Sequence, residues 1–290
     1  MHDVEAYLAH LAAERRLSAH TVAAYRRDLD ALARLAAGKA LRDLDTADIR
    51  SAIVRLRSRN LSAPSLARQI SAWRGFFGFA CRRLGYPRDP TTGVRPPKAA
   101  RRLPEPLSVD AMAQLLDRAP ADALEHRDRA MFELLYSSGL RLAELAAAGI
   151  GDLDLASGEI RVTGKGGKTR IVPVGSKASD ALRAWLRQRP AAPGEPALFV
   201  SRHGTRLTPR SIQSRLARWA RLAGIAQRVH PHKLRHAFAS HLLQSSADLR
   251  AVQELLGHAS ISTTQVYTHL DWQHLARVYD EAHPRARKKS

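Results

Sequence analysis

The sequence predicts a mainly α-helical protein with one small β-sheet, arranged as two domains. Apolar residues recur at helical spacing along most of the chain, two β-branched runs flank a glycine-rich turn near residue 165, and prolines gather at 87–106. The 290 residues are enough for two domains that each bury a core of their own.

Residues 1–86 are expected to form a small domain of four helices. The apolar spacing that begins at Val4 predicts the first helix, and Ser18 is a candidate cap for the second. Thr46 is expected to begin the third helix and Ser62 the fourth, which runs almost to the end of the domain.

Residues 87–106 are expected to form an extended basic linker. Six of the 15 prolines of the chain lie there, interleaved with arginines and a lysine. Proline removes backbone donors and resists helix formation, so the segment is expected to be extended. A long surface loop within a single domain is the alternative.

Residues 107–290 are expected to form a second domain, mostly α-helical with a β-hairpin. The runs 159–163 and 169–174 flank the turn Gly-Lys-Gly-Gly-Lys, which places Lys165 at the tip of the hairpin. A nucleotide-binding loop is excluded by spacing, because position 162 would have to be glycine and is Val162. Helices are expected at 108–116, 124–138, 176–189, 209–223, 232–246, 248–256 and 271–282.

The charge of the chain points to nucleic acid as its partner. The 47 Lys and Arg residues exceed the 27 Asp and Glu residues, for a formal net charge of +20. The excess lies in both halves of the chain, which argues against a basic tail and favours two surfaces that both face a phosphate backbone. A ribosomal-type basic protein is the alternative.

Three simple features bear on localisation. The single cysteine, Cys81, rules out an intrachain disulfide and fits a reducing compartment. The first residues include Asp3 and Glu5 and no uninterrupted apolar core, unlike a signal peptide, and no stretch approaches the ~20 apolar residues of a membrane span. A cytoplasmic protein is expected.

The segment Pro231-His232-Lys-Leu-Arg235-His236 carries residues suited to a phosphodiester. On a helix, His232 and Arg235 share a face, so that a guanidinium can bind nonbridging oxygens beside an imidazole that donates a hydrogen bond or moves a proton. A metal site is the alternative, because His236 and then His241 follow, but zinc would want a further ligand and Cys81 is distant. We expect no metal.

Two further segments contain candidate residues. Gly139 is expected to end one helix and Arg141 to open the next, where backbone N–H groups and the guanidinium would face an anion, although a surface ion pair between Arg141 and Glu144 explains the pattern equally well. Near the end, His258 follows a glycine that can stop a helix, and Tyr267 lies in a short polar helix. Alone, Tyr267 would be assigned a structural role.

Together, six residues in their order along the chain resemble the active site of the tyrosine recombinases of the phage integrase family: Arg141, Lys165, His232, Arg235, His258 and Tyr267. The phrases SSGLRLAEL, VTGKGGKTRIVPV, HPHKLRHAFASHLL and LLGHASISTTQVYTHLD are similar to the Xer subfamily. ERRLSAHTVAAYRRDL and NLSAPSLARQISAWRGFFGFA resemble its core-binding domain, so the likeness covers essentially the whole chain.

The resemblance implies a two-domain DNA clamp, in which a four-helix SAM-like core-binding domain precedes an α+β catalytic domain. It implies that Tyr267 attacks a scissile phosphate and forms a 3′-phosphotyrosyl intermediate, while Arg141 and Arg235 hold the nonbridging oxygens. Lys165 would protonate the leaving 5′ oxygen, His232 would assist deprotonation of the tyrosine, and His258 would hydrogen-bond the phosphate. The new ester conserves bond energy, so neither metal, ATP nor any other cofactor is expected.

The resemblance also implies partners: double-stranded DNA with a short recombination site, a sister Xer recombinase (XerD-like) in a heterotetramer, and a septal DNA translocase, for resolving chromosome dimers at cell division. The C-terminal helix, roughly Asp271 to Ala282, would pack into a neighbouring subunit. Candidate faces for base contacts are 65–83 and 209–221. A phage or transposon integrase is the rival enzyme, but the core-binding pattern begins at about Val4 and leaves no room for an arm-binding domain. A non-catalytic DNA-binding regulator should lack one of the six residues.

Overall fold

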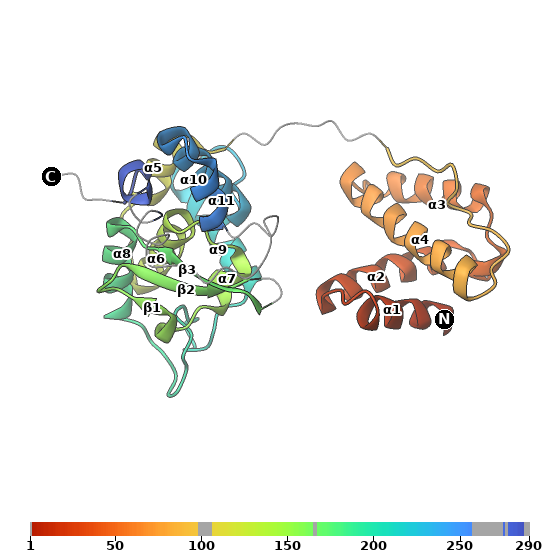
Figure 1. Cartoon of the computed structure of the whole chain (residues 1–290), viewed down its shortest axis with the longest axis horizontal. Coiled ribbons are helices and arrows are strands. Elements are labelled where there is room, and N and C mark those ends of the chain that lie inside the picture. Colours follow the sequence, from red (N-terminus) through yellow and green to blue (C-terminus); the bar gives the residue numbers. More distant parts are fainter. Residues whose placement is uncertain (1, 98–105, 165–166, 257–274, 276–277, 287–290) are drawn as a thin grey trace. The chain divides into compact units, whose positions relative to one another are not determined.

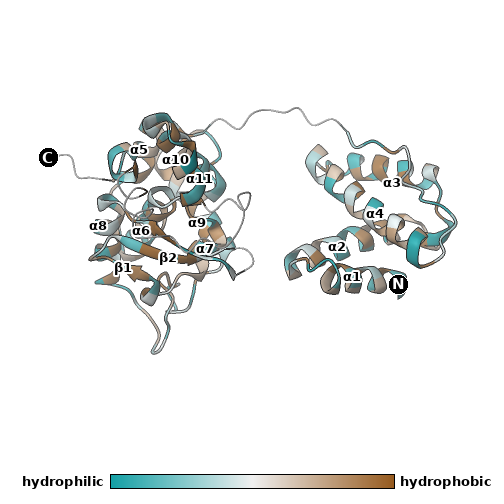
Figure 2. Cartoon of the chain, viewed as in Figure 1, coloured by the Kyte–Doolittle hydropathy of each residue, from teal (hydrophilic) through white to brown (hydrophobic). Residues whose placement is uncertain are grey.

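The computed structural model describes residues 2–97, 106–164, 167–256, 275 and 278–286. The chain divides into two compact units, Met1–Leu103 and Pro104–Ser290 (Figure 1). In both units the helices carry both apolar and polar residues, as Figure 2 shows, which is typical of helices that bury one face. The expected class, mainly α with a small sheet, is confirmed.

Unit 1 is a bundle of four helices around an aromatic core. Trp73, Phe76 and Phe77 are fully buried on the last and longest helix, and the Trp73 indole donates a hydrogen bond to the carbonyl of Asp28, 2.9 Å away. The helices are α1 (His2–Ala13), α2 (Ala19–Leu35), α3 (Thr46–Ser58) and α4 (Ala63–Arg83).

Side-chain caps fix the helix starts in unit 1. The hydroxyls of Ser18 and Ser62 accept hydrogen bonds from backbone N–H groups three residues later, as the sequence predicts. The third helix begins at Thr46 as expected, but its cap is the preceding Asp45, which exchanges reciprocal bonds with Asp48.

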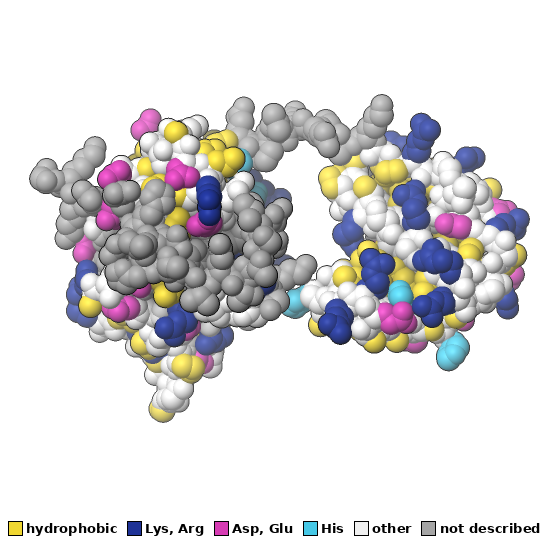
Figure 3. All heavy atoms as spheres, in the orientation of Figure 1, with side chains coloured by type: hydrophobic (Ala, Val, Ile, Leu, Met, Phe, Trp, Pro, Cys, Tyr) yellow, Lys and Arg dark blue, Asp and Glu magenta, His cyan; other side chains and the backbone are white. Residues whose placement is uncertain are grey.

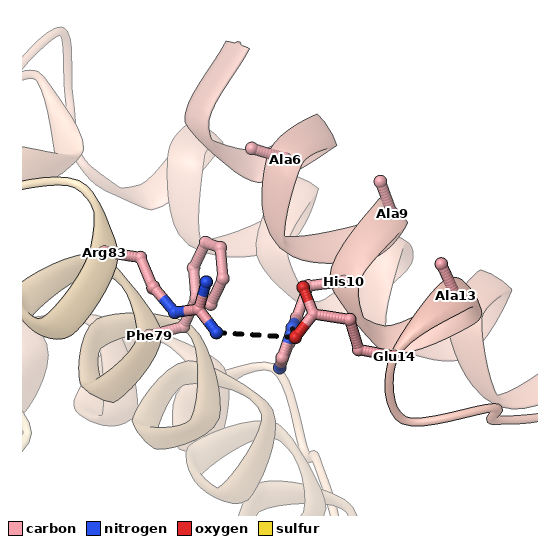
Figure 4. A pocket seen from close by; sticks show the side chains of 7 residues that line it. All are labelled: Ala6, Ala9, His10, Ala13, Glu14, Phe79 and Arg83. Carbon is pink, nitrogen blue, oxygen red and sulfur yellow. Dashed lines mark hydrogen bonds and ion pairs between the residues drawn. The ribbon is translucent and has the colours of Figure 1, made fainter.

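An open hollow of about 350 Å³ lies between α1 and α4 (Figure 4). Glu14 reaches both His10, at 3.0 Å, and Arg83, at 3.4 Å. The Arg83 and Glu14 side chains are largely exposed, so their ion pair adds little to stability. The packing of the His10 and Phe79 rings, whose centroids lie 4.9 Å apart, is the stronger contact between the two helices.

Unit 2 combines helices with a three-stranded antiparallel sheet of order β1-β2-β3. The long hairpin pairs Val162 with Arg170 and ends at the pair Thr163 and Thr169. The strands are β1 (Leu153–Asp154), β2 (Glu159–Thr163) and β3 (Thr169–Pro173). The helices are α5 (Val109–Leu116), α6 (Ala123–Ser137), α7 (Leu142–Ala147), α8 (Ser176–Leu186), α9 (Pro209–Leu222), α10 (Pro231–Ser246) and α11 (Leu249–Leu256).

Helix α6 is the centre of unit 2, because it packs against α8, α9 and α10. Several of its polar residues are buried as well: Glu133 binds Arg285, and the Ser137 hydroxyl lies 2.7 Å from that of Tyr279. The described C-terminal residues 278–286 therefore pack on their own unit. The sequence-based expectation placed a helix from about Asp271 against a neighbouring subunit, and residues 271–274 lie outside the described range.

Helix boundaries differ from the sequence prediction mainly where proline intervenes. Helix α8 ends at Leu186, a few residues early, with Pro190 following, and α10 begins one residue early because Pro231 suits the first helical position. Among the described residues, no helix is both long and apolar enough to cross a bilayer.

Candidate active site

The loop between α6 and α7 presents the first candidate residue. Gly139 adopts a left-handed conformation, with φ of +57°, and turns the chain so that Arg141 precedes α7 in an extended conformation. A Cβ atom on Gly139 would lie 2.5 Å from the Phe238 ring of α10. The turn is thus pressed directly against the helix that carries His232 and Arg235.

Glu144 holds Arg141 in place. Its carboxylate accepts hydrogen bonds from the backbone N–H and from Nη1 of Arg141, both at 2.8 Å. The ion pair considered as the alternative reading therefore exists, yet about a third of the Arg141 side chain remains exposed while Glu144 is buried. An oriented and partly accessible guanidinium is what anion binding requires.

Arg235 ties three segments together. Its Nη1 donates to the carbonyl of Gly139, at 2.5 Å, and its Nη2 donates to the carbonyl of Leu256 at the end of α11, at 2.6 Å. His232, one turn earlier on α10, is exposed. Arg141 and Arg235 thus come together from segments almost a hundred residues apart, with His232 on the same helix as Arg235.

The electrostatics of this region favour an anion. Burial, followed by the charge of Arg141, lowers the pKa of Arg235 to about 10, so it stays protonated at neutral pH. Burial raises the pKa of Glu144, but hydrogen bonds from Arg170 and Arg141 outweigh that effect and hold the pKa below its usual range. Three guanidinium groups thus face one ionised carboxylate, and a phosphate would relieve the repulsion among them.

The hairpin turn begins beside this cluster, and α11 ends at it. A Cβ on Gly164 would lie 3.4 Å from Glu144 Oε1, so β2 delivers the turn beside the carboxylate. Lys165, His258 and Tyr267 themselves lie outside the described residues. Of the six predicted active-site residues, the structure therefore describes Arg141, Arg235 and His232 and does not describe the other three.

The metal alternative gains no support from the described residues. His241 is buried and its Nδ1 lies 2.8 Å from the Tyr136 hydroxyl, while His232 and His236 are exposed. Within the described ranges, no three His, Cys, Asp or Glu side chains are grouped as metal ligands.

Basic side chains mark the outer surfaces of both units. Figure 3 shows lysine and arginine spread over the visible face of unit 1. In unit 2, α9 buries Ile212, Leu216 and Trp219, and its outer face carries exposed Arg210, Arg218 and Arg221. A helix that is basic on its exposed side is suited to a DNA groove.

Sequence reasoning missed Arg170. This residue of β3 is buried, and it donates two hydrogen bonds to Glu144, of 2.7 and 2.9 Å, and a third to the carbonyl of Leu255, of 3.2 Å. Strand alternation carried the signal, because Arg170 shares the inward face with Val172. A charge on that face requires a buried partner.

Comparison with known proteins identifies the family. The phage integrase family model matches residues 105–274, and the model of the phage integrase N-terminal SAM-like domain matches residues 4–84. The tyrosine recombinase XerC of Chromobacterium violaceum is 50% identical over 287 residues, which cover 99% of this chain and 96% of that protein. XerC of Azotobacter vinelandii is 53% identical over 292 residues, covering 99% and 97%.

Solved structures agree with this assignment. The XerA recombinase is 31% identical with a TM-score of 0.52, and the match covers 98% of this chain and 99% of that one. A lambda integrase dimer bound to a COC′ core site shares the fold, with a TM-score of 0.72 at 19% identity over 91% and 98% of the two chains. The resemblance to the Xer subfamily is confirmed, and within it the curated relatives named here are XerC proteins. The chain belongs to the phage integrase family of tyrosine recombinases, which carry out site-specific recombination of DNA.

Proposed function

We propose that this recombinase cuts and rejoins DNA through Tyr267. The phenol oxygen attacks the scissile phosphorus, the bond to the 5′ oxygen breaks, and a 3′-phosphotyrosyl ester and a 5′-hydroxyl result. His232 assists removal of the phenol proton, and Lys165 gives a proton to the departing oxygen. Attack by a 5′-hydroxyl on the ester reverses the chemistry and rejoins the strand.

The observation that carries this proposal is the cationic cluster at the start of α7. Arg141 and Arg235 lie together around one buried carboxylate, which suits them to the nonbridging oxygens and to the extra charge of the transition state. His258 would add a hydrogen bond to the same phosphate. Removing one such preorganised donor typically costs ~10²–10³ in rate.

Both units would bind one duplex; of the expected linker 87–106, Val94 packs in the core of unit 1. The outer faces of α4 and α9, the helices that contain the expected ranges 65–83 and 209–221, are the candidates for groove contacts. Affinity would then fall steeply with salt, as it does whenever many phosphates are neutralised.

In the cell, we infer that the enzyme acts in the cytoplasm on a short site together with an XerD-like sister recombinase in a heterotetramer. Resolution of chromosome dimers at division, under the control of a septal DNA translocase, is the role that similarity to XerC supports.

A nicked suicide substrate tests the proposal. Cleavage next to the nick releases a short fragment, so that religation fails and the covalent adduct accumulates. On its own site and with its partner present, the wild-type protein should give an adduct that survives denaturing electrophoresis, and Tyr267→Phe should give none while still binding DNA. Absence of a wild-type adduct would favour a DNA-binding regulator on the same fold.

A further inference from the structure

Arg170 is the most extensively bonded of the buried arginines around the candidate site. Only about 8% of its side chain is exposed, and each of its three guanidinium nitrogens donates a hydrogen bond to another element. Two bonds go to Glu144 on α7 and one goes to the carbonyl of Leu255 on α11. It thus joins the hairpin to two of the elements that build the site.

The bonds to Glu144 have an electrostatic consequence for Arg141. A buried carboxylate paired with Arg141 alone would both orient the guanidinium and cancel its charge. Because Arg170 binds both oxygens of Glu144, its own charge compensates the carboxylate. Glu144 can then orient Arg141 while the charge of Arg141 remains available to an anion.

The bond to α11 has a geometric consequence. The last carbonyls of a helix lack partners within the helix. Here Arg170 satisfies Leu255 and Arg235 satisfies Leu256, so the same guanidinium groups that surround Glu144 also fix the point where the chain leaves α11. In the sequence, His258 follows two residues later.

We propose that Arg170 is a positioning residue for the recombination reaction: it compensates Glu144, so that Arg141 is oriented without being neutralised, and it locks α11 to the same cluster. The inference rests on the proposed function, because it assumes that Arg141 stabilises charge on the scissile phosphate. Arg170 itself has no contact with the substrate in this proposal.

The test compares two suicide substrates in single-turnover cleavage. One carries the normal phosphate, and the other carries a methyl group in place of one nonbridging oxygen at the scissile position, which removes the negative charge. Arg170→Met should slow cleavage of the normal substrate between about 10-fold and 100-fold. On the neutral substrate its loss should stay within about 3-fold, because less charge needs stabilising.

The ratio of the two rates in one preparation is independent of the folded fraction, so a partly unfolded variant remains informative. The matched control is Arg127→Met, which removes an even more deeply buried arginine paired with Asp128 in the same unit and should leave the wild-type ratio unchanged. Arg170→Lys keeps the charge but not the three bonds, and should fall between wild type and Arg170→Met.

The double variant Arg170→Met/Glu144→Gln adds a sharper requirement. Replacing the uncompensated carboxylate by an amide should return the charge of Arg141 to the site, so the double variant should cleave the normal substrate faster than Arg170→Met alone. An equal penalty on both substrates, or a double variant slower than the single one, would overturn the proposal. A wild-type protein that forms no adduct would instead refute the proposed function.

Discussion

Gly139 offers a stability prediction whose size can be worked from the structure. The residue has a φ of +57°, and an added Cβ would meet the Phe238 ring at 2.5 and 2.7 Å, inside any normal contact. Gly139→Ala therefore combines a left-handed alanine, at about 1–2 kcal/mol, with overpacking of a closed core, at about 1–3 kcal/mol. We expect a loss of about 2–5 kcal/mol in the free energy of unfolding of unit 2.

Native-state hydrogen exchange is the suitable assay, because it reports the opening of unit 2 separately from unit 1. Gly194→Ala is the matched control. Gly194 has a φ of +76° and no atom within 4 Å of its added Cβ, so only the backbone strain of about 1–2 kcal/mol is expected.

A second substitution separates the two contributions. Phe238→Leu shortens the obstructing side chain, so the double variant Gly139→Ala/Phe238→Leu should lose about 1–3 kcal/mol less than the sum of the single losses. If Gly139→Ala costs no more than Gly194→Ala, or if the two substitutions are additive, the close packing of the α6–α7 turn on α10 is refuted.

Two other perturbations test the fold and the chemistry. Burial, with smaller effects of His241 and Arg285, lowers the pKa of His283 to about 3, whereas the unfolded chain takes up this proton near pH 6.5. As the pH falls from 6.5 to 3, this group should therefore lower the free energy of unfolding by about 1.4 kcal/mol per pH unit. His283→Gln should remove that part of the dependence of the unfolding free energy on pH in acid denaturation. An unchanged dependence would contradict the burial of His283. For the leaving group, a 5′-bridging sulfur departs without a proton, so such a substrate should largely restore cleavage by Lys165→Ala, and lack of restoration would leave Lys165 with a positioning role only.

The local features of the fold were predictable from the sequence because they depend on near neighbours. Ser18, Ser62 and Ser108 cap helices through bonds that span three residues, and the β-branched runs around Gly164 form the hairpin. The two-residue strand β1 was not predictable, because so short a segment has no periodicity and is defined only by its pairing with β2.

The site was predictable in its residue types but not in its construction. The family resemblance predicted Arg141 and Arg235. Their arrangement depends on the bonds of Arg235 to Gly139, 96 residues away in the sequence, and to Leu256 at the end of α11, 21 residues away. Arg170 illustrates the limit: strand alternation predicts that it is buried, but its bond to Leu255 spans 85 residues and exists only after packing.

The identity of the residue that becomes linked to DNA decides whether Tyr267 is the nucleophile. The chain has six tyrosines, and mass spectrometry of peptides from the trapped suicide complex distinguishes them. We expect a nucleotide adduct on Tyr267, with the DNA joined through its 3′ phosphate. An adduct on another residue, or linkage through a 5′ phosphate, would contradict it.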